Sequence, residues 1–153
     1  MSMNSAEYKK EITEACRQNL LESITILEEE MEMLKESASN GGEVGMSDRL
    51  ESNDEEMMNE RKDRENRREL LYQELRILDD LNTNEQNEGI QIGSIVISNQ
   101  RNFFIAIARM FQVEGKSFTG LSEAAPIFTS MKGRTAGESF TFNGQHFDII
   151  KVF

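Results

Sequence analysis

The stretch NTNEQNEGIQIGSIVIS, residues 82–98, decides the fold, because a helical pattern ends in it and a strand pattern begins. Its first half is polar and reaches Gly89, which is typical of a linker. From Gly89 onward, apolar residues recur at a period close to two, which indicates strands. We therefore expect one part over residues 1–85 and a second over residues 86–153.

The balance of charge changes at the same place. Residues 1–88 carry 11 Lys or Arg against 24 Asp or Glu, whereas residues 89–153 carry 6 against 4. Such a break supports two separately folded parts. The net charge of −11 also argues against wrapping of duplex DNA, which needs a basic face, so we expect no sequence-specific DNA binding. A protein or metal partner fits this composition better.

Cysteine content and hydropathy indicate the compartment. The single cysteine, Cys16, cannot form an internal disulfide, so the fold does not require an oxidising environment. The longest apolar run, FFIAIA at 103–108, is far shorter than a membrane span, and no signal peptide opens the chain. We expect a cytoplasmic protein with no membrane partner.

The first part is predicted to begin with one long helix. Residues 5–38 contain no Gly or Pro, and their apolar residues recur every three or four positions, which indicates a coiled-coil seam. The seam positions are Tyr8, Ile12, Cys16, Leu20, Ile24, Leu27, Met31, Leu34 and Ala38. At 1.5 Å per residue such a helix is roughly 50 Å long.

A second helix is predicted from about Asn53 to Leu81, which again lacks Gly and Pro. Its seam is apolar only near its end, and arginine stems can cover the rest while their charged heads reach water. The seam runs through Met57, Arg61, Arg64, Arg68, Leu71, Leu75 and Leu78. Two such helices joined by a short turn form an antiparallel hairpin, with the acidic stretch GGEVGMSDRLESNDEE near 41–56 as its tip.

The second part is predicted to be a small sheet with one short helix. Four apolar runs are separated by Gly or Asn turns: GSIVIS, NFFIAIA, ESFTF and FDIIKVF. Between them, a helix is expected to start near Pro126 and end at Gly133. The predicted fold class is α+β: a long antiparallel helical hairpin followed by a compact α+β domain.

Five short motifs in the second part occur in an order that resembles the Gre family of bacterial transcript cleavage factors, the GreA and GreB type. They are Gly93-Ser94-Ile95-Val96, Ala125-Pro126-Ile127, Gly133-Arg134, Gly137-Glu138 and Phe147-Asp148-Ile149. The resemblance extends over nearly the whole chain. It implies an N-terminal antiparallel coiled coil and a C-terminal domain similar to the FK506-binding proteins.

The resemblance also implies a function. Gre factors insert their hairpin tip into the secondary channel of RNA polymerase and present an Asp and a Glu to its active site, where backtracked RNA is cleaved. The family motif resembles Asp-x-x-Glu-Asn-x-Glu-Tyr, and this chain keeps the first two acids as Asp48 and Glu51, has Asp54 at the seventh position, and has Ser52 and Glu55 in place of Asn and Tyr. The implied partners are bacterial RNA polymerase and, indirectly, the 3′ end of its nascent RNA.

Asp48 and Glu51 are thus the expected catalytic acids and the expected ligands of a magnesium ion shared with the polymerase. Mg²⁺ takes oxygen ligands and commonly needs only one or two protein carboxylates beside water and phosphate. With a metal already held by the polymerase, they would complete a two-metal site that activates water. The chain itself is not expected to be an enzyme; it stimulates hydrolysis by the polymerase.

Two further groups of residues follow from the resemblance. Arg61, Arg64 and Arg68 correspond to a basic patch that faces RNA, and Ser122 with Pro126 corresponds to a loop that docks on the polymerase. Each set also has a structural interpretation: the arginines pair with glutamates such as Glu60, and Pro126 starts a helix.

The acids of the tip have a structural interpretation as well. Ser52 and Glu55 form a capping box, and acids in a first helical turn favour the helix dipole, which accounts for Asp54 and Glu55 but not for Asp48 or Glu51.

Three other functions remain open on the sequence. Relatives on the same scaffold regulate polymerase through its secondary channel without stimulating cleavage, and the altered tip with its insert NGGEVG suits such a factor. An FKBP-like peptidyl-prolyl isomerase would need a concave aromatic pocket. A structural coiled-coil adaptor would bind its partner regardless of the tip acids. His146 is expected to face solvent on a strand, and Cys16 to be a small seam residue.

Overall fold

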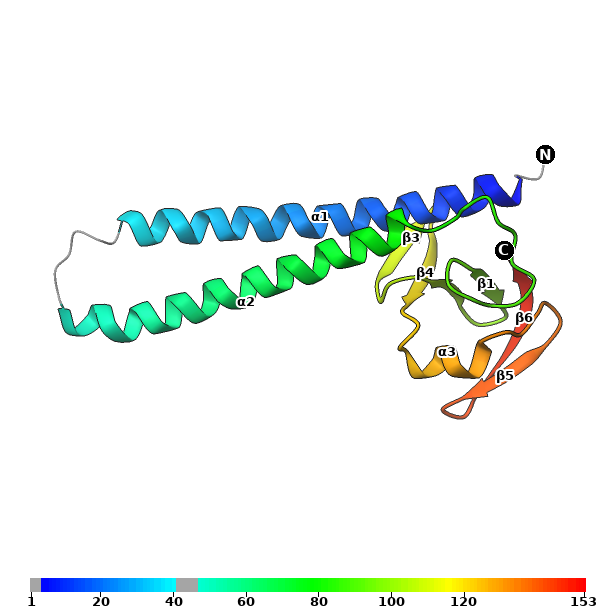
Figure 1. The fold of residues 1–153 in the computed structure, drawn as a ribbon. Helices are drawn as coiled ribbons and strands as arrows, with labels where there is room; N and C mark the ends of the chain where they lie inside the picture. Colours follow the sequence, from blue (N-terminus) through cyan, green and yellow to red (C-terminus); the bar gives the residue numbers. More distant parts are fainter. Residues whose placement is uncertain (1–3, 41–46) are drawn as a thin grey trace. The chain divides into compact units, whose positions relative to one another are not determined.

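The computed structural model describes the backbone of residues 4–40 and 47–153, and the side chains of residues 4–37 and 55–153. Its fold class is α+β, as predicted: two long helices are followed by a mixed six-stranded sheet and a short helix (Figure 1). The chain forms two compact units. One is Leu20–Leu75, and the other combines Met1–Asn19 with Arg76–Phe153. None of the helices in the described residues is long and apolar enough to cross a membrane.

Helix α1 is Ser5–Asn40 and helix α2 is Ser47–Asp79. The parts of these helices within Leu20–Leu75 form the helical unit, an antiparallel pair (Figure 1). Several apolar residues at the predicted seam positions are buried, because only one stripe of each helix faces the other, and Met31, Leu34 and Leu75 are half-buried. Leu20, Ile24, Leu27 and Leu71 are each at most 6% exposed.

Where the second seam was predicted to run through arginines, Arg64 and Arg68 are half-buried and Arg61 is exposed. The partial burial of Arg64 and Arg68 agrees with the prediction that arginine stems cover the seam, whereas Arg61 is more open to solvent.

The start of α2 differs from the prediction. We expected it near Asn53, with Ser52 as its cap, but the helix begins at Ser47, so Ser52 and the predicted capping box lie inside it. Serine is favoured at a helix start, an acid follows at position 48, and neither Gly nor Pro interrupts the chain from there to Leu81. The glycines of the predicted tip lie in residues 41–46, outside the described residues.

The sheet unit contains strands β1 to β6 in the order β3-β4-β2-β1-β6-β5. Strand β2 pairs with β4 in parallel, and every other neighbouring pair is antiparallel. The strands are β1 Ile95–Ser98, β2 Asn102–Ile105, β3 Met110–Val113, β4 Lys116–Leu121, β5 Ser139–Phe142 and β6 Gln145–Val152. The four predicted apolar runs correspond to β1, β2, β5 and β6.

Strands β3 and β4 were missed by the sequence analysis. They form a hairpin closed by Glu114 and Gly115, both with positive φ, of 51° and 79°. Asn143 and Gly144 close the β5–β6 hairpin in the same way, with φ of 49° and 78°. Asn-Gly is a strong signal for such a turn and Glu-Gly is a weak one, which is why the sequence analysis found the strands of the second hairpin and missed those of the first.

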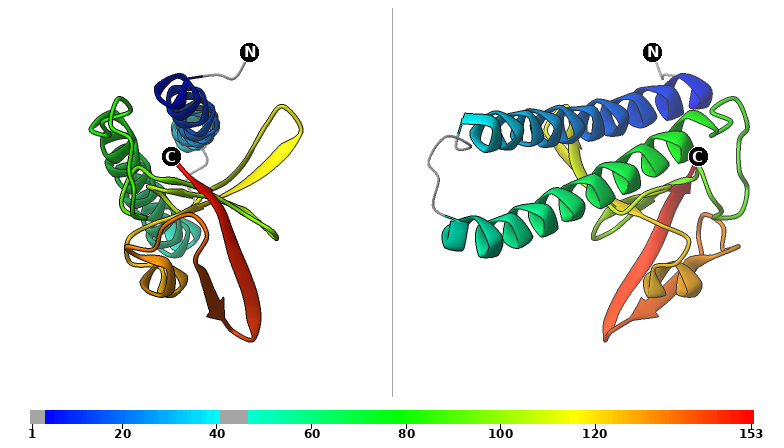
Figure 2. Two further views of the ribbon diagram at one scale, coloured as in Figure 1. Left: turned by 90° about the vertical axis from the view of Figure 1, so that its right-hand side faces the viewer. Right: turned by 60° about the vertical axis from the view of Figure 1, so that its left-hand side comes forward.

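Helix α3, Pro126–Met131, was predicted and is confirmed, with Pro126 in its first turn and Gly133 at a φ of +79° just past its end. It covers one face of the sheet (Figure 2, left), where Phe128 and Met131 pack into a core with strand residues. The strand residues of this core include Val96, Phe103, Ile105, Phe140, Phe147 and Ile149.

The opposite face of the sheet carries a second aromatic cluster. Phe111 stacks on Phe118 across the β3–β4 hairpin, with ring centroids 5.5 Å apart, and meets Phe104 edge-on at 6.0 Å. The first turns of α1 lie on this side (Figure 2, left). There the ring of Tyr8 lies 4.5 Å from that of Phe153, and Ile12 and Cys16 are buried.

Candidate functional site

The two acids predicted to hold a metal lie at the start of α2. Asp48 and Glu51 fall in its first turns, three positions apart. Their side chains lie outside the described residues, so their roles remain predictions. Elsewhere, within the residues that are described, no group of three or more His, Cys, Asp or Glu side chains is placed to hold a metal ion.

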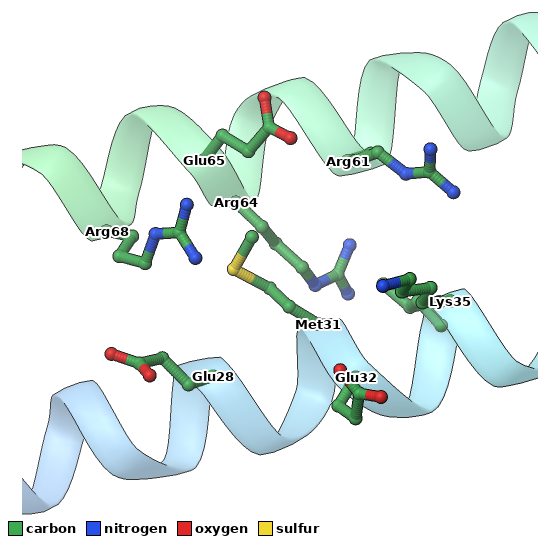
Figure 3. A pocket seen from close by; sticks show the side chains of 9 residues that line it. Glu28, Met31, Glu32, Lys35, Arg61, Arg64, Glu65 and Arg68 are labelled. Carbon is green, nitrogen blue, oxygen red and sulfur yellow. The ribbon is translucent and has the colours of Figure 1, made fainter.

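The three arginines of the predicted basic patch come together around one cleft of about 410 Å³ in the helical unit. Figure 3 shows Arg61, Arg64 and Arg68 on α2 facing α1, whose Lys35 extends toward the guanidinium of Arg64. The residues that line the cleft are Glu28, Met31, Glu32, Leu34, Lys35, Arg61, Arg64, Glu65 and Arg68.

Arg64 is held in place by acids of both helices. Its Nε lies 3.9 Å from a carboxylate oxygen of Glu30 on α1, and its Nη1 lies 3.9 Å from the carboxylate of Glu60 on α2. The same Nη1 donates a 3.4 Å hydrogen bond to the backbone carbonyl of Glu60. For this residue the structural interpretation is confirmed, because its charge is shared between two glutamates.

The other cations of the cleft lie farther from carboxylates than Arg64 does. Among the residues that the structure describes, no carboxylate lies within 4.0 Å of the charged groups of Arg61, Arg68 or Lys35. The cleft lining holds four cations and three carboxylates, which gathers basic residues within an otherwise acidic part of the chain. Guanidinium groups bind phosphate through paired N–H donors, which suits this lining to a phosphate-bearing chain.

A tyrosine beside the cleft was missed by the sequence analysis. The hydroxyl of Tyr72 donates a 2.6 Å hydrogen bond to Oε1 of Glu28, which links α2 to α1. This bond is the main cause of the raised pKa of Tyr72, and the positive charge of Arg68 works against it. Lys35 was missed too. Positions 28 and 35 are one heptad apart beside the seam, and that spacing is the signal that could have found them.

The predicted docking residues, Ser122 and Pro126, lie at the start of α3 in the sheet unit. The backbone carbonyl of Ser122 accepts a 3.1 Å hydrogen bond from the backbone N–H of Ala125, which forms the turn that leads into α3. Pro126 is exposed in the first turn. Its structural interpretation as a helix start is therefore confirmed, and its docking role remains a prediction.

The remaining candidate residues have structural roles. Cys16 is fully buried, as expected for a seam residue. His146 is exposed on β6, as predicted, and its Nε2 lies 2.9 Å from Oδ1 of Asp148. Phe103, Phe128, Phe140 and Phe147 are packed in the core, where Phe140 stacks on Phe147 at 4.9 Å.

No family model and no curated protein matches the chain. A search of solved structures finds "Structure of the transcription factor Gfh1", which is 18% identical, with 90% of this chain and 93% of that chain covered and a TM-score of 0.34. A likeness at that TM-score carries no inference about function.

Proposed function

We propose that this protein is a transcription factor of the Gre type, which binds a bacterial RNA polymerase, inserts its helical hairpin into the secondary channel and stimulates cleavage of backtracked RNA. The observation that carries the proposal is the ordered set of five motifs in the sheet unit, joined to an antiparallel helical hairpin. The proposal is also supported by the three arginines and one lysine that line a cleft between the two helices.

Three glycines of these motifs lie in turns where the backbone has a positive φ. Gly93 has a φ of +88° and is separated from β1 by Ser94, and Gly133 and Gly137 have φ of +79° and +92° between α3 and β5. Such backbone conformations favour glycine. These motifs combine turn glycines with an exposed proline, Pro126, and an exposed loop acid, Glu138. The combination is a more specific sign of the Gre family than any one of these residues alone.

In this function, Asp48 and Glu51 deliver carboxylates to the polymerase active site. Their oxygens suit Mg²⁺, a hard cation that binds few protein ligands and keeps several waters. The ion would stabilise the charge that develops on the phosphate during in-line attack by water. The polymerase supplies the remainder of the site, so the chain alone is proposed to have no nuclease activity.

The cleft lined by Arg61, Arg64 and Arg68 contributes affinity for the RNA phosphates. Arg64 lies 3.9 Å from carboxylate oxygens of Glu30 and Glu60. Arg61 and Arg68 have no carboxylate within 4.0 Å among the described residues, so they are the two proposed phosphate contacts. Ser122 and Pro126 dock the sheet unit on the polymerase.

The experiment that tests the function measures Mg²⁺-dependent cleavage of nascent RNA in a stalled, backtracked bacterial polymerase complex. The variant Asp48→Ala plus Glu51→Ala is compared with the native protein and with a matched control, Glu55→Gln plus Glu56→Gln, which alters two exposed acids further along α2. We expect the first variant to bind polymerase and to lose cleavage at least a hundredfold, and the control to retain it.

Two other results would change the conclusion. If the native protein binds polymerase but never stimulates cleavage, it is a channel-occupying regulator on the same scaffold. If it does not bind polymerase, the Gre assignment is wrong.

A further inference from the structure

A small pocket in the sheet unit lies apart from the helical cleft. It has a volume of about 220 Å³ and lies where the first turns of α1 meet the tip of the β3–β4 hairpin. Its floor is apolar, since Ile12 and Phe118 are each 1% exposed. The residues that line it are Tyr8, Glu11, Ile12, Val113, Glu114, Lys116 and Phe118.

The strand beside this pocket has a free edge. Among the strands that the structure describes, β3 is at the end of the sheet and pairs only with β4. Arg109 and Gly120, just before β3 and within β4, exchange two backbone hydrogen bonds of 3.3 and 2.8 Å. Hydrogen-bonded pairs alternate along an antiparallel ladder, so the N–H and C=O groups of Met110 and Gln112 point away from β4. They are available to another strand.

Strand β3 lacks the residues that usually protect an edge strand from pairing with another strand. Edge strands are commonly protected by charged residues, prolines or bulges, but β3 is Met-Phe-Gln-Val, without charge or proline. Met110 is 69% exposed. An extended segment added to this edge would gain backbone hydrogen bonds and an apolar contact with Met110.

Such a segment would direct some of its side chains into the pocket. Residues on one face of a strand alternate, so Val113 and Phe111 share a face, which is the face that carries Phe118 and meets α1. In an added strand, the residue that pairs with Val113 would point to this same face. Its side chain would enter the pocket between Glu11 and Glu114.

The lining of the pocket selects the charge of that side chain. Glu11 and Glu114 outnumber Lys116, and the hydroxyl-bearing ring of Tyr8 forms one wall. Burial and the negative charge of Glu11 raise the pKa of Tyr8, so its hydroxyl stays neutral. A guanidinium group matches this lining, because it pairs with carboxylates through several donors and stacks on aromatic rings.

We propose that the pocket receives an arginine side chain from an extended segment of a partner protein, which adds as a strand to the free edge of β3. The backbone of β3 holds the segment, and the pocket selects its arginine. This docking site does not depend on the tip acids or on the cationic cleft of the helical unit.

The test uses the full-length protein labelled with ¹⁵N and the probe peptide acetyl-Thr-Val-Arg-Val-Thr-amide. Titration should shift the amide signals of Met110, Gln112 and Val113. Replacing the arginine of the peptide by citrulline, which is neutral and of the same shape, should weaken binding at least tenfold. The protein variant Glu11→Gln plus Glu114→Gln should weaken it at least fivefold.

Two more variants separate the backbone from the pocket. Gln112→Pro removes an outward N–H and leaves the pairing of β3 with β4, because proline is tolerated at such an edge position, and it should abolish binding. Glu7→Gln, an exposed acid of α1 outside the pocket, should leave binding unchanged. Equal binding of the arginine and citrulline peptides, shifts confined to other strands, or no shift at millimolar peptide would each overturn the proposal.

Discussion

The Nζ of Lys9 donates a 2.7 Å hydrogen bond to the backbone carbonyl of Glu85, so the first helix holds the linker that follows the second. Lys9 is only 2% exposed, an unusual position for a lysine. Burial lowers the pKa of Lys9, and the negative charge of Glu85 partly offsets that effect. The linker that marks the change of pattern in the sequence is thus attached to the sheet unit through residue 9.

Replacing this lysine should destabilise the fold. Lys9→Met keeps the apolar stem but removes the hydrogen bond to the carbonyl of Glu85, an exposed residue, which should lower the free energy of unfolding by about 0.5–1.5 kcal/mol. Urea denaturation followed by circular dichroism measures the change. Lys10→Met, which alters the exposed neighbour, serves as the control and should change stability little. Equal stability of the two variants would contradict this role of Lys9.

The lowered pKa of Lys9 also predicts a dependence on pH. Between the folded pKa and the unfolded value near 10.5, the unfolded chain binds more protons than the folded one, so Lys9 makes stability rise with pH in that window. The native protein should therefore gain stability relative to Lys9→Met as pH increases toward 10.5. Urea midpoints measured in parallel at pH 8 and pH 10 test the sign, and a relative loss at pH 10 would refute it.

The hydrogen bond between Tyr72 and Glu28 should be visible in a phenol titration. It raises the pKa of Tyr72 above 10.0, because the neutral hydroxyl is the donor and the phenolate is repelled by the carboxylate. In a Tyr8→Phe background, absorbance at 295 nm reports Tyr72 alone. Glu28→Gln should lower its midpoint, and Glu29→Gln, at an adjacent exposed position, should not. A midpoint unchanged by Glu28→Gln would rule out the contact.

On the sheet, the carboxylate of Asp148 should titrate below its usual value of 3.8. A 2.7 Å hydrogen bond from the hydroxyl of Ser139 is the main cause of the lowered pKa, and His146 adds a smaller effect. Because the folded pKa is depressed, the contribution of Asp148 to stability is present above pH 3.8 and is lost as pH falls through the folded value. Ser139→Ala should raise the Asp148 midpoint in a ¹³C NMR titration, whereas Ser117→Ala should leave it unchanged.

Gly120 in β4 should tolerate no side chain. A Cβ there would lie within 3.0 Å of the backbone oxygens of Ile107 and Arg109, and backbone cannot move aside cheaply. We expect Gly120→Ala to lower the free energy of unfolding by about 2–4 kcal/mol, comparable to other severe packing clashes. The exposed Ser117→Ala in the same strand is the control, and thermal unfolding gives the comparison.

The cationic cleft predicts a difference between two pairs of basic residues on α2. Arg61→Gln plus Arg68→Gln removes two charges that line the cleft, and Lys62→Gln plus Arg67→Gln removes two exposed charges outside it. In the backtracked complex, the first pair should reduce cleavage about three- to tenfold, with a shallower salt dependence, because each lost phosphate contact reduces that dependence. Equal effects of the two pairs would show that only net charge matters.

The sequence alone determined the order and type of most elements. Unbroken helical periodicity defined α1 from Ser5, Pro126 and Gly133 bounded α3, and alternation with an Asn-Gly turn indicated β5 and β6. These signals are local, because each depends on which face of one element is apolar or on which residue allows a given φ.

Only the tertiary structure decided which distant residues meet. It paired β2 with β4 in parallel, buried Lys9 against Glu85, and gathered Arg61, Arg68 and Lys35 around one cleft. Strand pairing, helix register and burial depend on contacts between residues far apart in the chain, and no local pattern records them. The sequence therefore shows which charged residues the chain has, whereas only the fold brings Arg61, Arg68 and Lys35 together around the cleft.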